Sequence, residues 1–358
     1  MPIQSAQIVI ACSQFDATIA ALTGQLEFRV EMVSPADAPT TAVVSGFGVT
    51  LRLESSLHTK IDAPVLRMMA DHPPLNINVP DIRIEWARHD AAIQIPRAKQ
   101  EFIITRKASA EAWITGRAGM QYRDLIPGRF GGRFIASHIR IPDGGPVPDY
   151  VHFHDIRFQM IFCKAGSVRV VYEDQGEPFV LHAGDCVLQP PEIRHRVLEA
   201  SAGLEVIEIG CPAIHDTHAD HALLLPTPQV RAMRAFGGQR FVRHIGAESR
   251  WLPWRWIGQD TIGFEAQDSG INAATKSLAG VRIVRAVRAA RDAYTSVASH
   301  DGELLLLFLL QGALHLRSES LGDHTLHADD SVTIPPGVNV SLHAKTGAEF
   351  LEVSLPAA

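Results

Sequence analysis

The segment GPVPDYVHFHDIRFQMIFCKAG, residues 145–166, contains the residues that decide the fold. It begins at a glycine turn and continues as a predicted strand on which His152 and His154 stand two positions apart. Residues i and i+2 of a strand project from the same face, so both imidazoles are close enough to share a metal. Gln159 follows on the next predicted strand, which ends at a turn at Gly166.

A second segment, GDCVLQPPEIRHRVLE at residues 184–199, is predicted to be a strand, a Pro-Pro turn and another strand that carries His195. Three imidazoles with one amide or carboxylate form a suitable ligand set for Fe(II), Mn(II), Ni(II) or Zn(II). The alternative is that these histidines lie on surface strands and that the glycines only mark turns. Because the histidines, Gln159 and the flanking glycines occur together, we favour the metal site.

The two segments belong to one copy of an internal repeat. Residues 203–212 align with residues 347–356, residues 189–192 with 334–337, and residues 159–166 with 305–312, at offsets of 144, 145 and 146. Such small drifts are typical of duplicated β-domains, whose loops tolerate insertions. Alternating strand patterns and turn dipeptides predominate from about residue 101 onward. We therefore expect two similar all-β domains.

The motifs resemble those of the cupin superfamily, and the duplication resembles a bicupin. The first cupin motif is matched by Gly145, the His-x-His pair, Gln159 and Gly166. The second is matched by Gly184, Pro190 and His195, with Glu192 in place of the usual turn glycine. The resemblance covers roughly residues 131–212 and, less closely, 280–356. It implies a mainly β chain with two cupin barrels, which are double-stranded β-helix or jelly-roll folds.

By position, the resemblance implies that His152, His154, Gln159 and His195 are ligands of one divalent metal ion per chain, with Fe²⁺ favoured and Zn²⁺, Ni²⁺ or Mn²⁺ as alternatives. Most metal-binding cupins have glutamate where this chain has Gln159. A neutral amide leaves the full +2 charge on the ion, which should favour an anionic chelating substrate. It also removes a candidate base, so another group must take any proton.

The second repeat has lost this pattern. Its matching positions are Ala298, His300, Leu305 and Val340, and a single histidine does not hold a divalent ion. We therefore expect a metal-free second barrel. The apolar run at residues 304–310 predicts a strand buried on both sides, as at an interface between the two barrels or between subunits.

The N-terminal segment differs from both repeats. Residues 6–54 are predicted to follow the order strand, helix and three strands, with the helix at residues 15–22. This order resembles half of a vicinal-oxygen-chelate (glyoxalase-type) module, for which AVVSGFGVTLRLE at residues 42–54 is the most similar stretch. Only Glu54 falls near a metal-ligand position of that family, so we expect a structural, dimerising or substrate-covering module. The expected domains are residues 1–100, a small α+β module, 101–225, the metal-binding barrel with a connector, and 226–358, the second barrel.

Several residues near the motifs are further candidates. Tyr150 has the strand parity of the two motif histidines and is expected to face the barrel lumen. His138 and Arg140 on the preceding strand are candidates to orient a substrate, and ordinary surface or salt-bridged roles are the alternative for both. His215, His218 and His221 lie in the connector, where we expect a solvated loop rather than a metal cluster. A second helix is expected near residues 229–236.

Composition excludes several classes of protein. The chain has 358 residues, a net charge of −6 and 46% hydrophobic residues, which is typical of a globular protein of two or three domains. The acidic balance argues against nucleic acid as a partner. No apolar run approaches the roughly 20 residues of a membrane-spanning helix, and no basic segment precedes an apolar one near the N-terminus. We expect a cytoplasmic protein that does not bind membranes.

The combined expectation is a metal-dependent cupin enzyme, most simply a non-haem Fe(II) dioxygenase acting on an anionic chelating small molecule such as a hydroxylated aromatic acid or a diketone. The first alternative is a non-redox isomerase or hydrolase of a sugar-acid-like substrate. The second is a ligand-binding or sensor bicupin without turnover, since one fold hosts all three. A homodimer or higher homo-oligomer is also expected.

Overall fold

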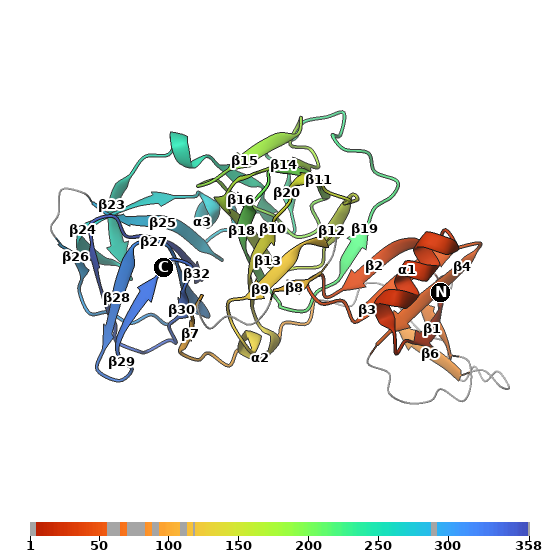
Figure 1. Cartoon of the computed structure of the whole chain (residues 1–358), viewed down its shortest axis with the longest axis horizontal. Helices are drawn as coiled ribbons and strands as arrows, with labels where there is room; N and C mark the ends of the chain where they lie inside the picture. Colours follow the sequence, from red (N-terminus) through yellow and green to blue (C-terminus); the bar gives the residue numbers. More distant parts are fainter. Residues whose placement is uncertain are drawn as a thin grey trace.

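The computed structural model describes residues 5–55, 65–69, 83–87, 93–107, 113–116, 119–287 and 292–356. Figure 1 shows three parts in a row: a small α+β module at the N-terminal end, a β-barrel in the middle and a second β-barrel at the far end. The mainly β fold agrees with the alternating sequence pattern. Among the described helices, none combines the length and the apolar character needed to cross a membrane.

The N-terminal module has the predicted order of strand, helix and three strands. Its elements are β1 (Ser5–Ala11), α1 (Phe15–Gln25), β2 (Arg29–Ser34), β3 (Thr41–Gly46), β4 (Val49–Glu54), β5 (Val65–Met69) and β6 (Arg83–Ala87). The strands pair in the order β2-β3-β4-β1-β5-β6. Phe15 of the helix packs with Val33, Val44 and Leu53 of the sheet, which gives the module its own core. Its resemblance to a glyoxalase-type module stays a prediction.

The first barrel consists of two facing sheets. Its elements are β8 (Ile114–Thr115), β9 (Gln121–Asp124), α2 (Arg129–Gly132), β10 (Ile135–Ile141), β11 (Gly145–Pro146), β12 (His152–His154), β13 (Phe158–Ala165), β14 (Ser167–Tyr172), β15 (Phe179–His182), β16 (Cys186–Leu188), β17 (His195–Ala200), β18 (Leu204–Cys211) and β19 (Thr217–Ala219). One sheet has the order β15-β14-β17-β12-β19, and the other has the order β16-β13-β18-β10-β9-β8.

The second barrel repeats this arrangement. Its elements, with the segment leading into it, are β20 (Ala235–Phe236), β21 (Gln239–Arg240), β22 (Val242–His244), η2 (Gly246–Glu248), β23 (Leu252–Trp256), β24 (Gln259–Asp268), α3 (Ile271–Ala274), β25 (Gly280–Ala286), β26 (Asp292–Thr295), β27 (Leu304–Gln311), β28 (Ala313–Ser318), β29 (Gly322–His327), β30 (Ser331–Thr333), β31 (Ser341–Lys345) and β32 (Glu349–Leu355). Two short strands join the barrels, since β22 pairs with β16 and β7 (Ile103–Thr105) pairs with β30. The domain limits expected from the sequence stay predictions.

The apolar strand β27 is buried on both faces, as its sequence predicts. Leu304, Leu306 and Phe308 pack in a core between the two barrels, together with Phe158 and Phe162 of β13. The alternate residues of β27 pack inside the second barrel. The strand therefore serves two cores, which explains why its sequence is continuously apolar rather than alternating.

The helix expected near residues 229–236 is absent, and the chain there forms bends, a turn and the short strand β20. Arg234 donates to Glu173 and Asp174 of the first barrel at 2.6 and 2.8 Å, and the Arg231 amide donates to the Asp174 carbonyl. These contacts hold the segment along the barrel surface, where it does not need internal helical hydrogen bonds.

The N-terminal module is joined to the first barrel through β19. This strand pairs with β12 on one side and with β2 on the other, so the two sheets form one continuous surface. Figure 1 shows β19 and β2 side by side at this junction. The Ser34 hydroxyl donates to the His215 carbonyl at 3.2 Å and adds a side-chain contact to the same junction. The module is therefore fixed next to the strand that carries the His-x-His pair.

Candidate metal centre

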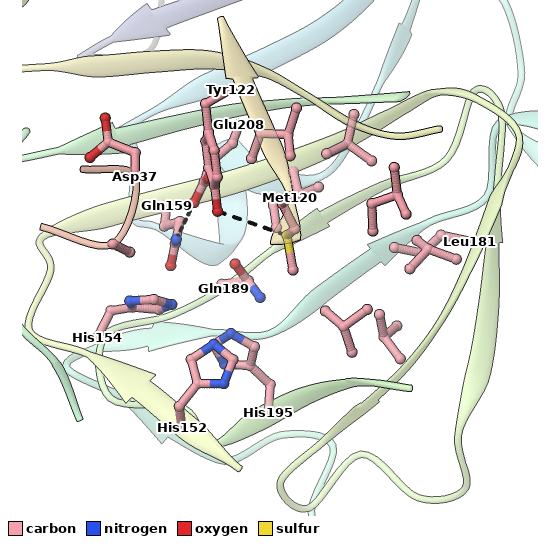
Figure 2. A pocket seen from close by; sticks show the side chains of 18 of the residues that line it. Asp37, Met120, Tyr122, His152, His154, Gln159, Leu181, Gln189, His195 and Glu208 are labelled. Atoms are coloured by element: carbon pink, nitrogen blue, oxygen red, sulfur yellow. Dashed lines mark hydrogen bonds between the residues drawn. The ribbon is translucent and has the colours of Figure 1, made fainter. Parts of the chain in front are cut away.

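Three histidines from two adjacent strands meet inside the first barrel. His152 lies opposite His195 in the antiparallel β12–β17 pair, and His154 follows two residues along β12. One nitrogen from each ring lies within 4.8 Å of the others, and all three side chains are buried. Figure 2 shows the rings gathered at one end of the cavity. The pairing of β12 with β17 thus brings His154 close to His195, which lies 41 positions further along the chain.

The Nδ1 atom of each ring is already engaged. His152 donates from Nδ1 to the Tyr150 carbonyl at 2.8 Å, and His195 donates to the Ile193 carbonyl at 2.9 Å. His154 Nδ1 bonds the Thr217 hydroxyl at 2.9 Å. A ring whose Nδ1 carries the proton presents an unprotonated Nε2 lone pair, which is the form that ligates metals. The carbonyl partners of His152 and His195 therefore make Nε2 the metal-binding atom of these two rings, and the Thr217 hydroxyl, which can accept or donate, is compatible with the same tautomer of His154.

Gln159 completes the set, and a carboxylate fixes its orientation. Its Nε2 donates to Glu208 Oε1 at 2.5 Å, while its Oε1 is buried and has no hydrogen-bond partner among the described residues. A flipped amide would place two oxygens against each other, so the Glu208 carboxylate selects the observed orientation. A buried amide oxygen without a partner is costly unless something else binds it. The orphaned oxygen and the three imidazoles fit a divalent metal ion.

The four side chains line the head of a cavity of about 100 Å³. The remaining wall is largely aliphatic and includes Ile139, Ile161, Val170 and Leu181. Ile161 and Gln159 lie two positions apart on β13 and line the same cavity. An apolar wall of this kind excludes water and contacts the hydrocarbon part of a ligand.

The charges around the cavity are acidic. Glu208 and Asp37 both line it, and within the described part of the chain no lysine or arginine does. Asp37 belongs to the loop between β2 and β3, so the N-terminal module contributes directly to the cavity. Figure 2 shows Asp37 on the same side as Gln159 and His154.

Tyr172 packs against one face of the His195 ring. Its ring stacks on the imidazole with the centroids 5.4 Å apart, and its hydroxyl accepts a hydrogen bond from Gln189 at 2.9 Å. Burial raises the pKa of Tyr172, so the phenol stays protonated. The stacking limits rotation of the His195 ring.

The expected substrate residues on β10 face the wrong way. Ile139 and Ile141 line the cavity, so His138 and Arg140 lie on the opposite face of the strand. His138 is bonded to Arg123 and Glu205 at 2.9 and 2.8 Å, and the Arg140 guanidinium lies over Trp113 at 4.0 Å. The structure therefore does not bring these two residues to the cavity, and both have the paired, non-catalytic surroundings that were the alternative expectation.

Tyr150 is half-buried, and its ring lies 6.0 Å from that of His152. It precedes β12 and does not line the described cavity wall. Its backbone carbonyl contributes to the site by accepting a hydrogen bond from His152 Nδ1.

The part of the connector that carries His215 and His218 is not a solvated loop, contrary to expectation, whereas His221 lies on an exposed bend as expected. Residues 217–219 form β19, and the His215 ring lies 5.4 Å from that of His154 and lines the cavity. Burial lowers the pKa of His215, and its Nδ1 bonds the Pro212 carbonyl at 3.0 Å. His218 bonds Asp155 at 2.8 Å and stacks on Phe153, outside the cavity.

The second barrel has apolar residues at the corresponding positions. Ala298 bridges Val340 just as His152 pairs with His195, which confirms the alignment of the repeats. Leu305, at the position of Gln159, is part of the barrel core. His300 bonds the Ile334 carbonyl and the Gly302 amide. That this barrel is metal-free stays a prediction.

Glu208 and Thr217 are two residues of the site that were not expected from the sequence. A signal for Glu208 was present, because residues 203–212 align with 347–356 and place it at the position of Glu352. Glu352 is buried and accepts a hydrogen bond from Trp254 at 3.0 Å, whereas Glu208 is half-buried. Thr217 lies on a strand of only three residues, which is too short for an alternating pattern.

Solved structures with a similar fold include oxalate decarboxylase from Bacillus subtilis, with 10% identity, a TM-score of 0.52, and coverage of 74% of this chain and 78% of the other. A variant of salicylate 1,2-dioxygenase from Pseudoaminobacter salicylatoxidans, solved with gentisate, has 16% identity, a TM-score of 0.49, and coverage of 73% and 83%. No family model matches the sequence, and no curated protein matches it. The first similarity confirms the fold, which comprises two cupin barrels.

Proposed function

We propose that this chain, which has the bicupin fold, is a metal-dependent enzyme that binds one divalent ion in its first barrel. The observation that carries the proposal is the buried set of three histidines with the orphaned Gln159 oxygen. His152, His154, His195 and Gln159 would hold the ion. When bound, the ion would polarise substrate oxygens, and iron would in addition supply redox chemistry with dioxygen.

The cavity favours a dioxygenase over the two alternatives. An aliphatic pocket admits dioxygen, which is small and apolar, and it excludes water from a reactive site. A sugar acid needs many hydrogen-bonding partners, which Ile139, Ile161 and Val170 do not offer. The buried, neutral ligand set leaves the charge of the ion undiminished, so it favours deprotonation of a chelating substrate.

The charges narrow the substrate class that was expected from the sequence. A hydroxylated aromatic acid carries a carboxylate, which would lie in a cavity lined by Glu208 and Asp37 without any lysine or arginine from the described residues. Asp37 is paired with Arg129, so Glu208 is the carboxylate that would repel such a substrate most. We therefore favour a substrate that chelates through two oxygens and is otherwise uncharged, such as a diketone or a catechol.

The protein side chains have separate tasks in this scheme. Glu208 holds the Gln159 amide so that its oxygen faces the cavity, and Thr217 orients the His154 ring through its bond to Nδ1. The aliphatic wall orients the apolar part of the substrate. We also propose that the protein forms a homodimer or higher homo-oligomer, as expected from the sequence.

Oxygen uptake tests the proposal. The protein is reconstituted with Fe(II) under argon and mixed with aerated buffer containing pentane-2,4-dione, catechol or gentisate. We expect uptake equal to the substrate consumed for the diketone or the catechol, and less for gentisate. Absence of uptake across this panel by protein that holds stoichiometric iron would contradict the dioxygenase assignment.

A further inference from the structure

We propose that the cavity selects a substrate whose chelating head carries one unbranched apolar chain, and that Val197 is the specificity-determining residue that excludes a branched chain. This inference rests on the proposed function, because the bound metal ion must hold the head of the substrate. It makes the substrate class narrower, since an acyclic diketone can carry such a chain, whereas the ring of a catechol is wider than a chain.

The metal end and the aliphatic end of the cavity lie far apart. Leu181, which lines the cavity, belongs to β15, and His152 belongs to β12. The sheet order β15-β14-β17-β12 separates them by three strand spacings, which amounts to about 14 Å. Figure 2 shows Leu181 on the opposite side of the cavity from His154 and Gln159. A molecule held at the metal therefore extends toward an aliphatic wall.

The change from polar to aliphatic residues occurs one inward-facing position beyond the metal centre. On four strands, a residue of the site and an aliphatic residue two positions away on the same strand both line the cavity. These pairs are His195 and Val197 on β17, Gln159 and Ile161 on β13, Glu208 and Val206 on β18, and Tyr172 and Val170 on β14. The part of a substrate directly beyond the chelating oxygens is thus surrounded by hydrocarbon from both sheets.

The cavity is narrow for its length. Its lining residues on β10 extend from Ile135 to Ile141, and six residues of strand rise about 20 Å. The cavity volume is about 100 Å³, which over such a length leaves room for a single file of carbon atoms. A linear chain fits this shape, whereas a branch at the first carbon beyond the head pushes against the wall. Because barrel interiors are closely packed, the wall yields only at a cost in free energy.

Val197 is the wall residue best placed to detect such a branch. It follows His195 by two residues, so the two Cα atoms are about 7 Å apart, and it lies opposite Val170 in the β14–β17 pair. It is half-buried and lines the cavity, and its backbone amide donates to Asp149 Oδ2 at 2.9 Å. A β-branched side chain has little rotational freedom, so the two methyl groups form a fixed part of the wall.

Three diketones test this inference. Pentane-2,4-dione carries the chelating head alone, heptane-2,4-dione adds two carbons in a line, and 5-methylhexane-2,4-dione is the isomer of heptane-2,4-dione that is branched next to the head. Their dissociation constants are measured by calorimetry under argon on the full chain loaded with Fe(II). For the native protein we expect the linear isomer to bind about tenfold more tightly than pentane-2,4-dione, since each buried methylene increases the affinity about fourfold. The branched isomer should bind no more tightly than pentane-2,4-dione.

Val197→Ala should remove the discrimination between the two isomers. The shorter side chain opens the wall next to the metal, so we expect the branched isomer to gain about tenfold in affinity and the linear isomer to change by about twofold or less. Ile161→Ala widens the cavity from the facing sheet and should give the branched isomer the same gain, which keeps the inference testable if Val197→Ala does not fold. Circular dichroism and iron content establish that each variant is folded and loaded.

Leu198→Ala is the matched control. Leu198 follows Val197 on β17 and is also half-buried, but it lies on the other face of the strand and does not line the cavity. The order of the three diketones should not change in this variant, and an equal change there would overturn the role of Val197. Equal dissociation constants of the two isomers in native protein, or a preference for the linear isomer that persists in both Val197→Ala and Ile161→Ala, would overturn this inference and leave the proposed function intact. Failure of iron-loaded native protein to bind any of the three diketones would overturn both.

Discussion

His152 and His195 face each other across the β12–β17 pair, and the centroids of their imidazole rings are 4.2 Å apart. The Nδ1 atom of each ring is bonded to a backbone carbonyl, so a metal in the space between the rings would be coordinated through their Nε2 atoms. His154 and the Gln159 oxygen are arranged around that space as well. The pairing of two strands, rather than any local motif, therefore creates the candidate metal centre.

Thr217→Val should weaken metal binding. The threonine hydroxyl is the partner of His154 Nδ1 and is fully buried, so its loss frees the ring to rotate or to change tautomer. Removal of such a partner typically lowers metal affinity by about 10 to 100-fold. Competition with a chromophoric chelator measures the affinity. Thr217→Ser keeps the hydroxyl and should retain native affinity, and an unchanged affinity in Thr217→Val would show that the bond is dispensable.

Glu208→Gln should also lower metal affinity, by about tenfold. A neutral amide opposite Gln159 can pair with it in either orientation, so the Gln159 oxygen no longer faces the cavity at all times. The same chelator competition applies. Glu199→Gln, which changes an exposed carboxylate on β17, is the control and should have no effect. Equal losses in both variants would mean that overall charge, rather than orientation of the amide, is responsible.

Gln159→Glu should destabilise the metal-free protein. The change places a second carboxylate 2.5 Å from Glu208, and we expect the free energy of unfolding to fall by about 1–3 kcal/mol. The double variant Gln159→Glu with Glu208→Gln restores an amide–carboxylate pair with the roles exchanged. It should recover most of the loss in denaturant titrations of metal-free protein. No recovery would show that the two side chains do not interact.

The buried His138 should make the protein less stable in mild acid. Burial lowers the pKa of His138, and the nearby charge of Arg123 lowers it further. In the unfolded chain this histidine has its ordinary pKa near 6.5, so it binds a proton more readily than in the folded state. The unfolded state then binds more protons, and the free energy of unfolding falls as the pH drops below about 6.5. His138→Gln should reduce this slope by up to about 1.4 kcal/mol per pH unit, as measured by denaturant unfolding between pH 7 and 5. An identical slope in the variant would contradict this assignment.

The sequence predicts the barrels well because they depend on periodic patterns. Alternation identifies the strands, and the offsets of 144 to 146 residues identify the repeat. The continuously apolar β27 correctly predicts a strand that packs on two cores, with Leu306 in one and Leu307 in the other. Each of these features is a property of many residues and tolerates errors at single positions.

The remaining features depend on single positions or on distant contacts. A shift of one residue decides which residues of β10 face the cavity. His138 is buried on the other face, where it is bonded to Arg123 of β9 and Glu205 of β18. The alternation of the sequence does not reveal these partners. Asp37 lines the cavity because β2 pairs with β19. In this pair Val33 lies opposite Thr217, which is 184 residues further along the chain. The sequence offers no local signal for such a contact.

Metal analysis of the native protein, purified without chelators from medium with no added metal, tests the central claim most directly. We predict one equivalent of a divalent transition metal per chain, with iron the most abundant, and less than a tenth of an equivalent in His195→Ala with an unchanged circular dichroism spectrum. Native protein without bound metal after incubation with Fe(II), Zn(II), Ni(II) and Mn(II), or stoichiometric metal retained in His195→Ala, would contradict the account.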